Sequence, residues 1–258
     1  MSRFAAYLGP PIALANFLVT PTQSLIQQAS HHSEGRTTPE VEGYGFGWFT
    51  GIHPMRYSQP VPIWTDTNLV ALAASLQRGL WFGFLGGGHS ELDYGATSAQ
   101  PLHDELMLFA HDGFVADFAH TLRPYCLRYL QPEFAAQVDE NTDSAYLFAL
   151  LRQRLREFDE ISIEGALQNI LSTLQVTLME VPSQLNLLVS DGRRLVATRY
   201  ATRNQSTPVY YTVNDPTFPA NAQLVASHPL TTGSNWRQLP PNHMLILSSD
   251  APPSVLHI

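Results

Sequence analysis

Three short stretches of this sequence contain residue types that could do chemistry. His31-His32 could bind a metal ion, Gly86–Gly88 could cradle a phosphate, and "FAHDGF" places the carboxylate of Asp112 before a glycine. Adjacent histidines do not share one face of a helix or strand, which favours a solvated loop over a metal site. The glycines lack the following lysine and helix start of a phosphate loop, which favours a tight turn or close packing. Asp-Gly is itself typical of a turn.

Composition excludes several classes of protein. A chain of 258 residues with 44% hydrophobic residues can bury a sizeable core. A formal net charge of -8, with 14 arginines and no lysine, argues against a nucleic-acid partner. The single cysteine, Cys126, excludes a disulfide framework and a thiolate metal cage, and suits the cytoplasm. The sequence contains neither a secretory signal nor an apolar run of membrane length, so we expect no membrane association. No motif indicates a metal or another cofactor.

The elements that must position the chemical groups begin with strands. Residues 3–8 predict a short strand that the following "GPP" ends, and residues 12–18 predict a helix. The polar segment 30–42 reads as a loop. The aromatic and glycine-rich stretches 44–51 and 80–88 are typical of strands whose backbones approach closely.

Two amphipathic helices and a hairpin follow in the second half. "SAYLFALLRQRLREF" (144–158) has apolar residues at helical spacing, with Asp143 placed to cap the helix. Residues 162–178 predict a second helix, and residues 183–201 predict a strand, an Asp-Gly turn and a strand. Strands, then two helices, then strands indicate sheets covered by helices rather than alternating βαβ units.

The motifs, taken in order, resemble those of class II glutamine amidotransferases, a family of N-terminal-nucleophile hydrolases. The similarity extends from residue 1 to about residue 249 and is carried by "MSRFAAYLGPP", "EGYGFGWF", "PIWTDTNL", "FAHDG", "NTDSAYL", "QLNLLVSDGRRLVAT" and "LVASHPL". The most similar branch is the stand-alone type that includes the γ-glutamyl amide hydrolase of ergothioneine biosynthesis. The resemblance implies a single domain over residues 1–258. It also implies the α+β class, as a four-layer αββα sandwich of two antiparallel sheets flanked by helices.

The resemblance also implies a reaction. In active relatives, removal of the initiator methionine exposes a cysteine that attacks the γ-carboxamide of glutamine or a γ-glutamyl conjugate. The α-amine of the same residue acts as the general base. An asparagine side chain and a backbone N–H form the oxyanion hole. An arginine binds the α-carboxylate of the substrate, and an aspartate binds its α-ammonium group.

Three of the four side-chain positions differ in this sequence. Ser2 replaces the cysteine; it could be a weaker nucleophile, an ordinary Met-Ser start or an engineered exchange. Asp112, before Gly113, replaces the asparagine, and an ionised carboxylate has no proton to donate unless burial keeps it protonated. Gly86 falls on the arginine position and offers no charge. Asp143 matches the aspartate, although a role as helix cap would explain it equally well.

These exchanges leave three hypotheses about function. The first is an amidotransferase-like protein that does not hydrolyse glutamine and binds a protein partner, a second copy or a small amide or amine in the former catalytic cleft. The second is a serine-type N-terminal-nucleophile amidohydrolase that acts on a γ-glutamyl or another amide. The third is a γ-glutamyl amide hydrolase that compensates for the exchanges elsewhere. We expect the first.

The exchanges also predict a change in ligand preference. Loss of a positive charge at Gly86 and gain of a carboxylate at Asp112 favour a cation or a neutral amide over an α-carboxylate. Aromatic rings would suit an amine if they faced the cleft. The candidate rings are Tyr44, Phe46, Trp81 and Phe82. "WTD" (64–66) and "SHP" (227–229) are interpreted as fold markers or pocket wall rather than as catalysts.

Overall fold

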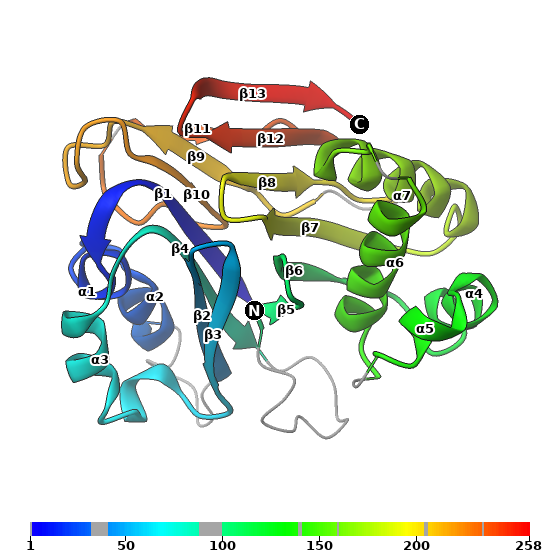
Figure 1. The fold of residues 1–258 in the computed structure, drawn as a ribbon, viewed down its shortest axis with the longest axis horizontal. Coiled ribbons are helices and arrows are strands. Elements are labelled where there is room, and N and C mark those ends of the chain that lie inside the picture. The colour runs from blue at the N-terminus through cyan, green and yellow to red at the C-terminus, as the bar shows by residue number, and fades with distance from the viewer. Residues whose placement is uncertain are drawn as a thin grey trace.

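Two antiparallel sheets lie face to face in the computed structural model, which describes residues 2–31, 41–87, 100–138, 141–158, 160–203, 206–233 and 235–258 (Figure 1). The seven-stranded sheet of the described residues has the order β11 (Arg237–Gln238), β9 (Tyr210–Val213), β10 (Gln223–Ala226), β1 (Arg3–Ala13), β4 (Gln77–Gly87), β2 (Val41–Thr50), β3 (His53–Gln59). The six-stranded sheet of the same residues has the order β13 (Ala251–His257), β12 (His243–Ser248), β8 (Arg194–Arg199), β7 (Ser183–Ser190), β6 (Leu108–Val115), β5 (Leu102–His103).

Helices cover the outer face of each sheet. The first group of helices packs on the seven-stranded sheet: α1 (Leu14–Leu18), α2 (Leu25–His31), the 3₁₀ turn η1 (Ile63–Thr65) and α3 (Leu69–Ser75). The second group, drawn in green in Figure 1, packs on the six-stranded sheet: α4 (Leu122–Tyr129), α5 (Pro132–Ala135), α6 (Asp143–Glu157) and α7 (Ile163–Thr177). This arrangement confirms the four-layer αββα sandwich. No helix of the described residues is long and apolar enough to cross a membrane.

Alternation along the strands builds three separate cores. On β1, Phe4 and Ala6 pack between the two sheets, whereas Ala5 and Tyr7 pack under the helices of the first group. On β6, the intervening positions divide in the same way, with Ala110 between the sheets and its neighbours toward α6. Successive side chains of a strand point to opposite faces, so position along the strand decides which layer a residue enters.

The N-terminal strand is longer than the sequence predicts. β1 continues through Pro10 and Pro11 to Ala13, and α1 begins only at Leu14. The register with β4 shifts between Leu8 and Ile12, and this irregularity accommodates two residues that have no N–H to donate. The prediction that the prolines end the strand is therefore wrong.

Both described ends of the predicted loop 30–42 belong to regular secondary structure. Ser30 and His31 belong to α2, and Val41 and Glu42 belong to β2. Residues 32–40, with His32, lie outside the described residues. The two long helices and the 183–201 hairpin are confirmed, and Gly192 takes the left-handed conformation that the tight turn requires, with φ of 86°.

Candidate functional site

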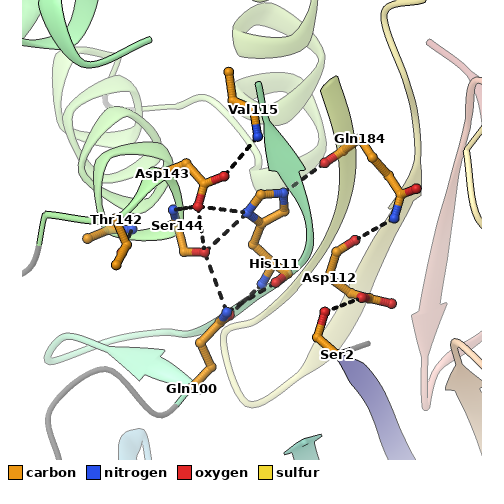
Figure 2. Close-up of polar contacts among 10 residues, drawn as sticks. Ser2, Gln100, His111, Asp112, Val115, Thr142, Asp143, Ser144 and Gln184 are labelled. Atoms are coloured by element: carbon orange, nitrogen blue, oxygen red, sulfur yellow. Dashed lines mark hydrogen bonds and ion pairs between the residues drawn. The ribbon is translucent and has the colours of Figure 1, made fainter. Parts of the chain in front are cut away.

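The start of β1 brings Ser2 to the inner face of the seven-stranded sheet, opposite β6. β1 pairs with β4 so that Arg3 lies opposite Leu85, and continuing this register places Ser2 opposite Gly86. The Ser2 hydroxyl donates a hydrogen bond of 2.5 Å to Oδ1 of Asp112 on the facing sheet (Figure 2). The structure therefore brings Ser2, Gly86 and Asp112 together from three strands.

Asp112 lies in the middle of a strand, so the interpretation of Asp112-Gly113 as a turn is wrong. Both residues pair with β7 in regular register, Asp112 opposite Asn186 and Gly113 opposite Leu185. A Cβ atom at Gly113 would lie 1.9 Å from the carbonyl oxygen of Gln184, so the strand pairing itself requires glycine here. The close approach of β6 to β7 explains this glycine without any catalytic role.

The Asp112 carboxyl is almost entirely buried, with an exposed fraction of 7%. Burial raises its pKa above the ordinary value, while the hydrogen bond from Ser2 and the positive charge of Arg3 oppose that rise. Arg3 itself points to the other face of β1, where Nη1 donates to Oε1 of Gln28 on α2 at 3.0 Å. Arg3 therefore lies behind the sheet and does not extend beside Ser2.

Polar side chains of β7 complete the surroundings of Asp112, and the sequence analysis missed them. The Gln184 amide donates to the Asp112 carbonyl oxygen at 3.2 Å and to Oγ1 of Thr207 at 2.8 Å. The Asn186 amide donates to the Thr207 carbonyl oxygen and to the same Oγ1. Two polar residues at alternate positions of an otherwise apolar strand, as in "SQLNLLVS", were the available signal.

Asn186 leaves a buried acceptor without a partner. Its side chain is fully buried, and Oδ1 has no hydrogen bond within the described part of the chain. The orientation of the amide is fixed because the Thr207 carbonyl oxygen accepts only, so the nitrogen must face it. Asn186 pairs with Asp112 across the two strands, but its amide N–H groups donate to Thr207. It therefore adds an acceptor, not a replacement for the missing amide donor.

His111 and Asp143 form a separate polar cluster on the helix-facing side of β6 (Figure 2). His111 Nε2 lies 2.9 Å from the Gln184 carbonyl oxygen and must donate to it, and Nδ1 lies 3.1 Å from Oγ of Ser144. Asp143 Oδ2 accepts from Val115 N at 2.9 Å, which ties α6 to β6. Thr142, not Asp143, caps α6, because its Oγ1 accepts from the third residue of the helix.

The edge of β6 beside Asp143 contains a backbone donor. His111 N–H donates to Gln100 Oε1, and Val115 N–H donates to Asp143, so these alternate residues direct their N–H groups to one edge. Gly113 lies midway between them and directs its N–H to the same edge. The side chain of Asp143 has an exposed fraction of 20% there, so it remains accessible to a ligand.

Gly86 belongs to β4 and pairs with Gly43, so a tight turn at Gly86–Gly87 is not formed; Gly88 lies outside the described residues. A Cβ atom at Gly86 would come no closer than 3.5 Å to its neighbours, so packing does not require glycine at this position. Arg78, on the same strand, lies eight residues away, roughly 26 Å in an extended chain. It cannot take the place of an arginine at position 86.

The four candidate aromatic rings do not line the site. Tyr44, Phe46 and Trp81 pack under the helices of the first group, on the face of the sheet away from Asp112. Phe82 faces the other sheet, but it is completely buried in the core. These buried rings stabilise the sandwich and do not offer a surface to an amine.

The segments 64–66 and 227–229, interpreted above as fold markers or pocket wall, make structural contacts. Ser227 pairs with the start of β1: its N–H donates to the Phe4 carbonyl oxygen, and its Oγ accepts from Phe4 N, both at 3.0 Å. Asp66 accepts hydrogen bonds from the hydroxyls of Tyr44 and Tyr57. Among the described residues, no group of three or more histidine, cysteine, aspartate or glutamate side chains is arranged to hold a metal ion.

Comparison with known proteins gives consistent matches. Residues 88–255 match the family model for glutamine amidotransferases class-II. The chain is 24% identical to the gamma-glutamyl-hercynylcysteine sulfoxide hydrolase of Mycobacterium tuberculosis, covering 95% of this chain and 92% of that protein. A glutamine aminotransferase class-II domain protein from Silicibacter pomeroyi has the same fold, with a TM-score of 0.70, 24% identity and coverage of 99% and 98%.

A larger protein contains the same fold as one part. The glutamine phosphoribosylpyrophosphate amidotransferase of B. subtilis aligns with 99% of this chain at a TM-score of 0.61 and 14% identity, and the match covers 49% of that protein. The fold of this chain therefore matches nearly all of one solved chain and about half of a longer one.

Proposed function

The chain belongs to the class II glutamine amidotransferase family, and we propose from this premise that it is a member without glutaminase activity whose site at Ser2 and Asp112 binds a ligand instead. The proposal includes a cytoplasmic location, which suits a chain whose single cysteine, Cys126, is free and buried. The ligand is a molecule that presents an ammonium group or an amide N–H.

The hydrogen bond from Ser2 Oγ to Asp112 Oδ1 is the observation that carries this proposal. The family reaction requires residue 2 to attack a carbonyl carbon while a donor at position 112 binds the oxygen that becomes negative. In this chain the Ser2 hydroxyl instead donates a hydrogen bond to the Asp112 carboxyl group at that position. When it is ionised, this carboxylate repels a developing oxyanion instead of stabilising it.

The magnitude of these losses supports a non-catalytic role. Removing one oxyanion donor raises the barrier by about 2.7–4 kcal/mol, which is 10²–10³ in rate. Ser2 is also a weaker nucleophile than a cysteine thiolate. Gly86 supplies no guanidinium for an α-carboxylate, and neither Arg3 nor Arg78 lies where it could do so. Together these differences weaken the nucleophile, the stabilisation of the oxyanion and the orientation of the substrate.

The ligand class follows from the groups that remain. Two buried acceptors lie on paired positions of β6 and β7: the Asp112 carboxyl and Oδ1 of Asn186, which has no hydrogen bond among the described residues. An amine or amide N–H complements these acceptors, whereas the α-carboxylate of glutamate would be repelled. The donor group could belong to a small molecule or to a side chain of a partner protein, and the small molecule is the simpler fit to an almost fully buried carboxyl.

A reversion series tests this proposal. The substitutions Ser2→Cys, Gly86→Arg and Asp112→Asn restore the family residues, and the structure predicts that they fold, because two are isosteric and the third has room for its Cβ. We expect ammonia release from glutamine or from a γ-glutamyl amide only in the triple variant. Hydrolysis of either compound by the wild-type chain would refute the proposal. An inactive triple variant would show that further positions have changed.

A second function is favoured by the same hydrogen bond. Asp112 is placed to accept the Ser2 proton and so could act as the general base of a serine-type amidohydrolase, with the Gly113 N–H as the remaining oxyanion donor. The sequence contains no lysine, so the α-amine of the mature chain is the one primary amine that an amine-reactive acetylating reagent can modify. Amide hydrolysis that survives acetylation but is lost in Asp112→Asn would favour this second function.

A further inference from the structure

A pocket of roughly 390 Å³ lies at the far end of β8, outside the site described above. Its lining includes Arg199, Thr202, Arg203, Ser206 and Asn242, and none of the described residues that line it is acidic. A volume near the lower end of the range for small-molecule sites suits a compact metabolite rather than a large cofactor. The pocket therefore combines two guanidinium groups with neutral hydrogen-bonding side chains.

Arg199 is buried without an acidic partner. Its exposed fraction is 8%, and its three nitrogens donate only to neutral oxygens: Oγ and O of Ser206, and O of Leu239. Within the described residues it forms no ion pair with a carboxylate. The two residues that precede Ser206 in the sequence are Asn204 and Gln205, neither of which carries a charge. Burying a cation is costly unless an anion compensates it.

Burial lowers the pKa of Arg199, which is the effect of desolvation on a cation without sufficient countercharge. Arg203, at the rim, is half-exposed and pairs with Glu180. The guanidinium of Arg199 has five N–H groups in a planar fork, and three hydrogen bonds leave donors available for a further oxygen. Forked donors of this kind match the geometry of carboxylate and phosphate groups.

We propose that this pocket is a binding site for a compact oxyanion, the phosphate or carboxylate group of a small molecule, which neutralises Arg199. The anion supplies the countercharge that Arg199 lacks among the described residues, while Ser206 and Asn242 offer further hydrogen bonds. This inference does not depend on whether the chain hydrolyses an amide.

The pocket is connected to the first site through two adjacent residues. Ser206 contacts Arg199, and Thr207 contacts Gln184 and Asn186, which lie beside Asp112. An anion that orders Ser206 also fixes Thr207, because the two share a peptide bond. The pocket and the Asp112 site therefore share one short segment of the chain.

Isothermal titration of the full-length protein with inorganic phosphate and with malonate, at constant ionic strength in chloride, tests the proposal. We expect saturable binding of one or both, and the stronger ligand identifies the source of the oxyanion. Arg199→Met should reduce affinity by about tenfold or more, the loss expected for charge-assisted hydrogen bonds. Arg203→Gln should weaken it by about two- to fivefold, as for an exposed charge.

Two further variants keep the test decisive. Arg193→Gln removes an exposed arginine at the other end of β8, about 20 Å from Arg199, and should bind as the wild type does. If Arg199→Met does not fold, Ala201→Phe fills the pocket while leaving the Arg199 hydrogen bonds in place, and it should abolish binding. The proposal is overturned if neither anion binds more tightly than chloride. It is also overturned if Arg203→Gln and Ala201→Phe both bind as tightly as the wild type.

Discussion

Replacement of Gly113 by alanine is expected to destabilise the fold strongly, because β6 and β7 approach too closely for a Cβ atom. That atom would lie 1.9 Å from the Gln184 carbonyl oxygen and 2.7 Å from Nε2 of His111. The first contact is with backbone of the paired strand, so relief requires the strands to separate by about 1.5 Å. Such a shift breaks local ladder hydrogen bonds, each contributing about 0.5–1.5 kcal/mol.

The overpacking itself costs about 1–3 kcal/mol. Together with one or two lost hydrogen bonds, we expect Gly113→Ala to lower the free energy of unfolding by about 3–4 kcal/mol. In a chain of this size each kcal/mol changes Tm by roughly 2–4 °C, so Tm should fall by roughly 6–16 °C. Urea unfolding followed by circular dichroism, together with calorimetry, measures both quantities.

Gly86→Ala is the matched control. The new Cβ would meet nothing closer than the Gly43 carbonyl oxygen at 3.5 Å, and the backbone at Gly86 is not in the left-handed region. We expect stability within about 0.5 kcal/mol of the wild type, or a gain of up to about 1 kcal/mol from the less flexible unfolded chain. If Gly113→Ala changed stability by less than about 1 kcal/mol, or if both variants lost the same amount, the reasoning about strand packing would be refuted.

Three further changes test the site and its supports. Ser2→Ala removes the donor to a buried carboxyl and should destabilise the chain by about 1–3 kcal/mol at neutral pH, measured by urea unfolding. Asp112→Asn should gain stability relative to the wild type as pH rises above the ordinary carboxyl pKa of 3.8. Because the pKa of Asp112 is raised in the folded state, the wild type loses the stability that the protonated Asp112 carboxyl contributes as pH rises through that folded-state pKa. Unfolding at pH 4, 6 and 8 measures the difference, and a difference that shrinks with pH contradicts the cause given. Thr142→Ala removes the cap of α6 and should cost about 1 kcal/mol; no loss in thermal unfolding would disprove the cap.

Much of the architecture could be predicted because the patterns that indicate it are local. Apolar spacing identified α6 and α7, and the Asp-Gly turn identified the β7–β8 hairpin. The bulge in β1 could not be predicted, because two prolines more often end a strand than cross an irregular register. The faces of the aromatic rings depend on which layer covers each face, and alternation alone does not assign that layer.

The candidate site was also predicted only in part. Ser2, Gly86 and Asp112 were identified by resemblance, and the register of β1 with β4 brings the first two together as expected. The turn assigned to Asp112 was wrong because strand pairing with β7 overrides a local preference of Asp-Gly. The contacts of Asn186 with Thr207 join segments far apart in the sequence, so no local pattern indicates them.

Ammonia release from glutamine by the wild-type protein is the decisive measurement of its role. Intact-mass analysis must first show that the chain begins at Ser2, because a retained Met1 blocks the α-amine that the family uses as base. With Asp112 in place of an amide donor and Gly86 in place of an arginine, we expect no release above that of a heat-inactivated sample. Turnover at a rate typical of enzymes, roughly 1 per second or more, would contradict the non-catalytic role.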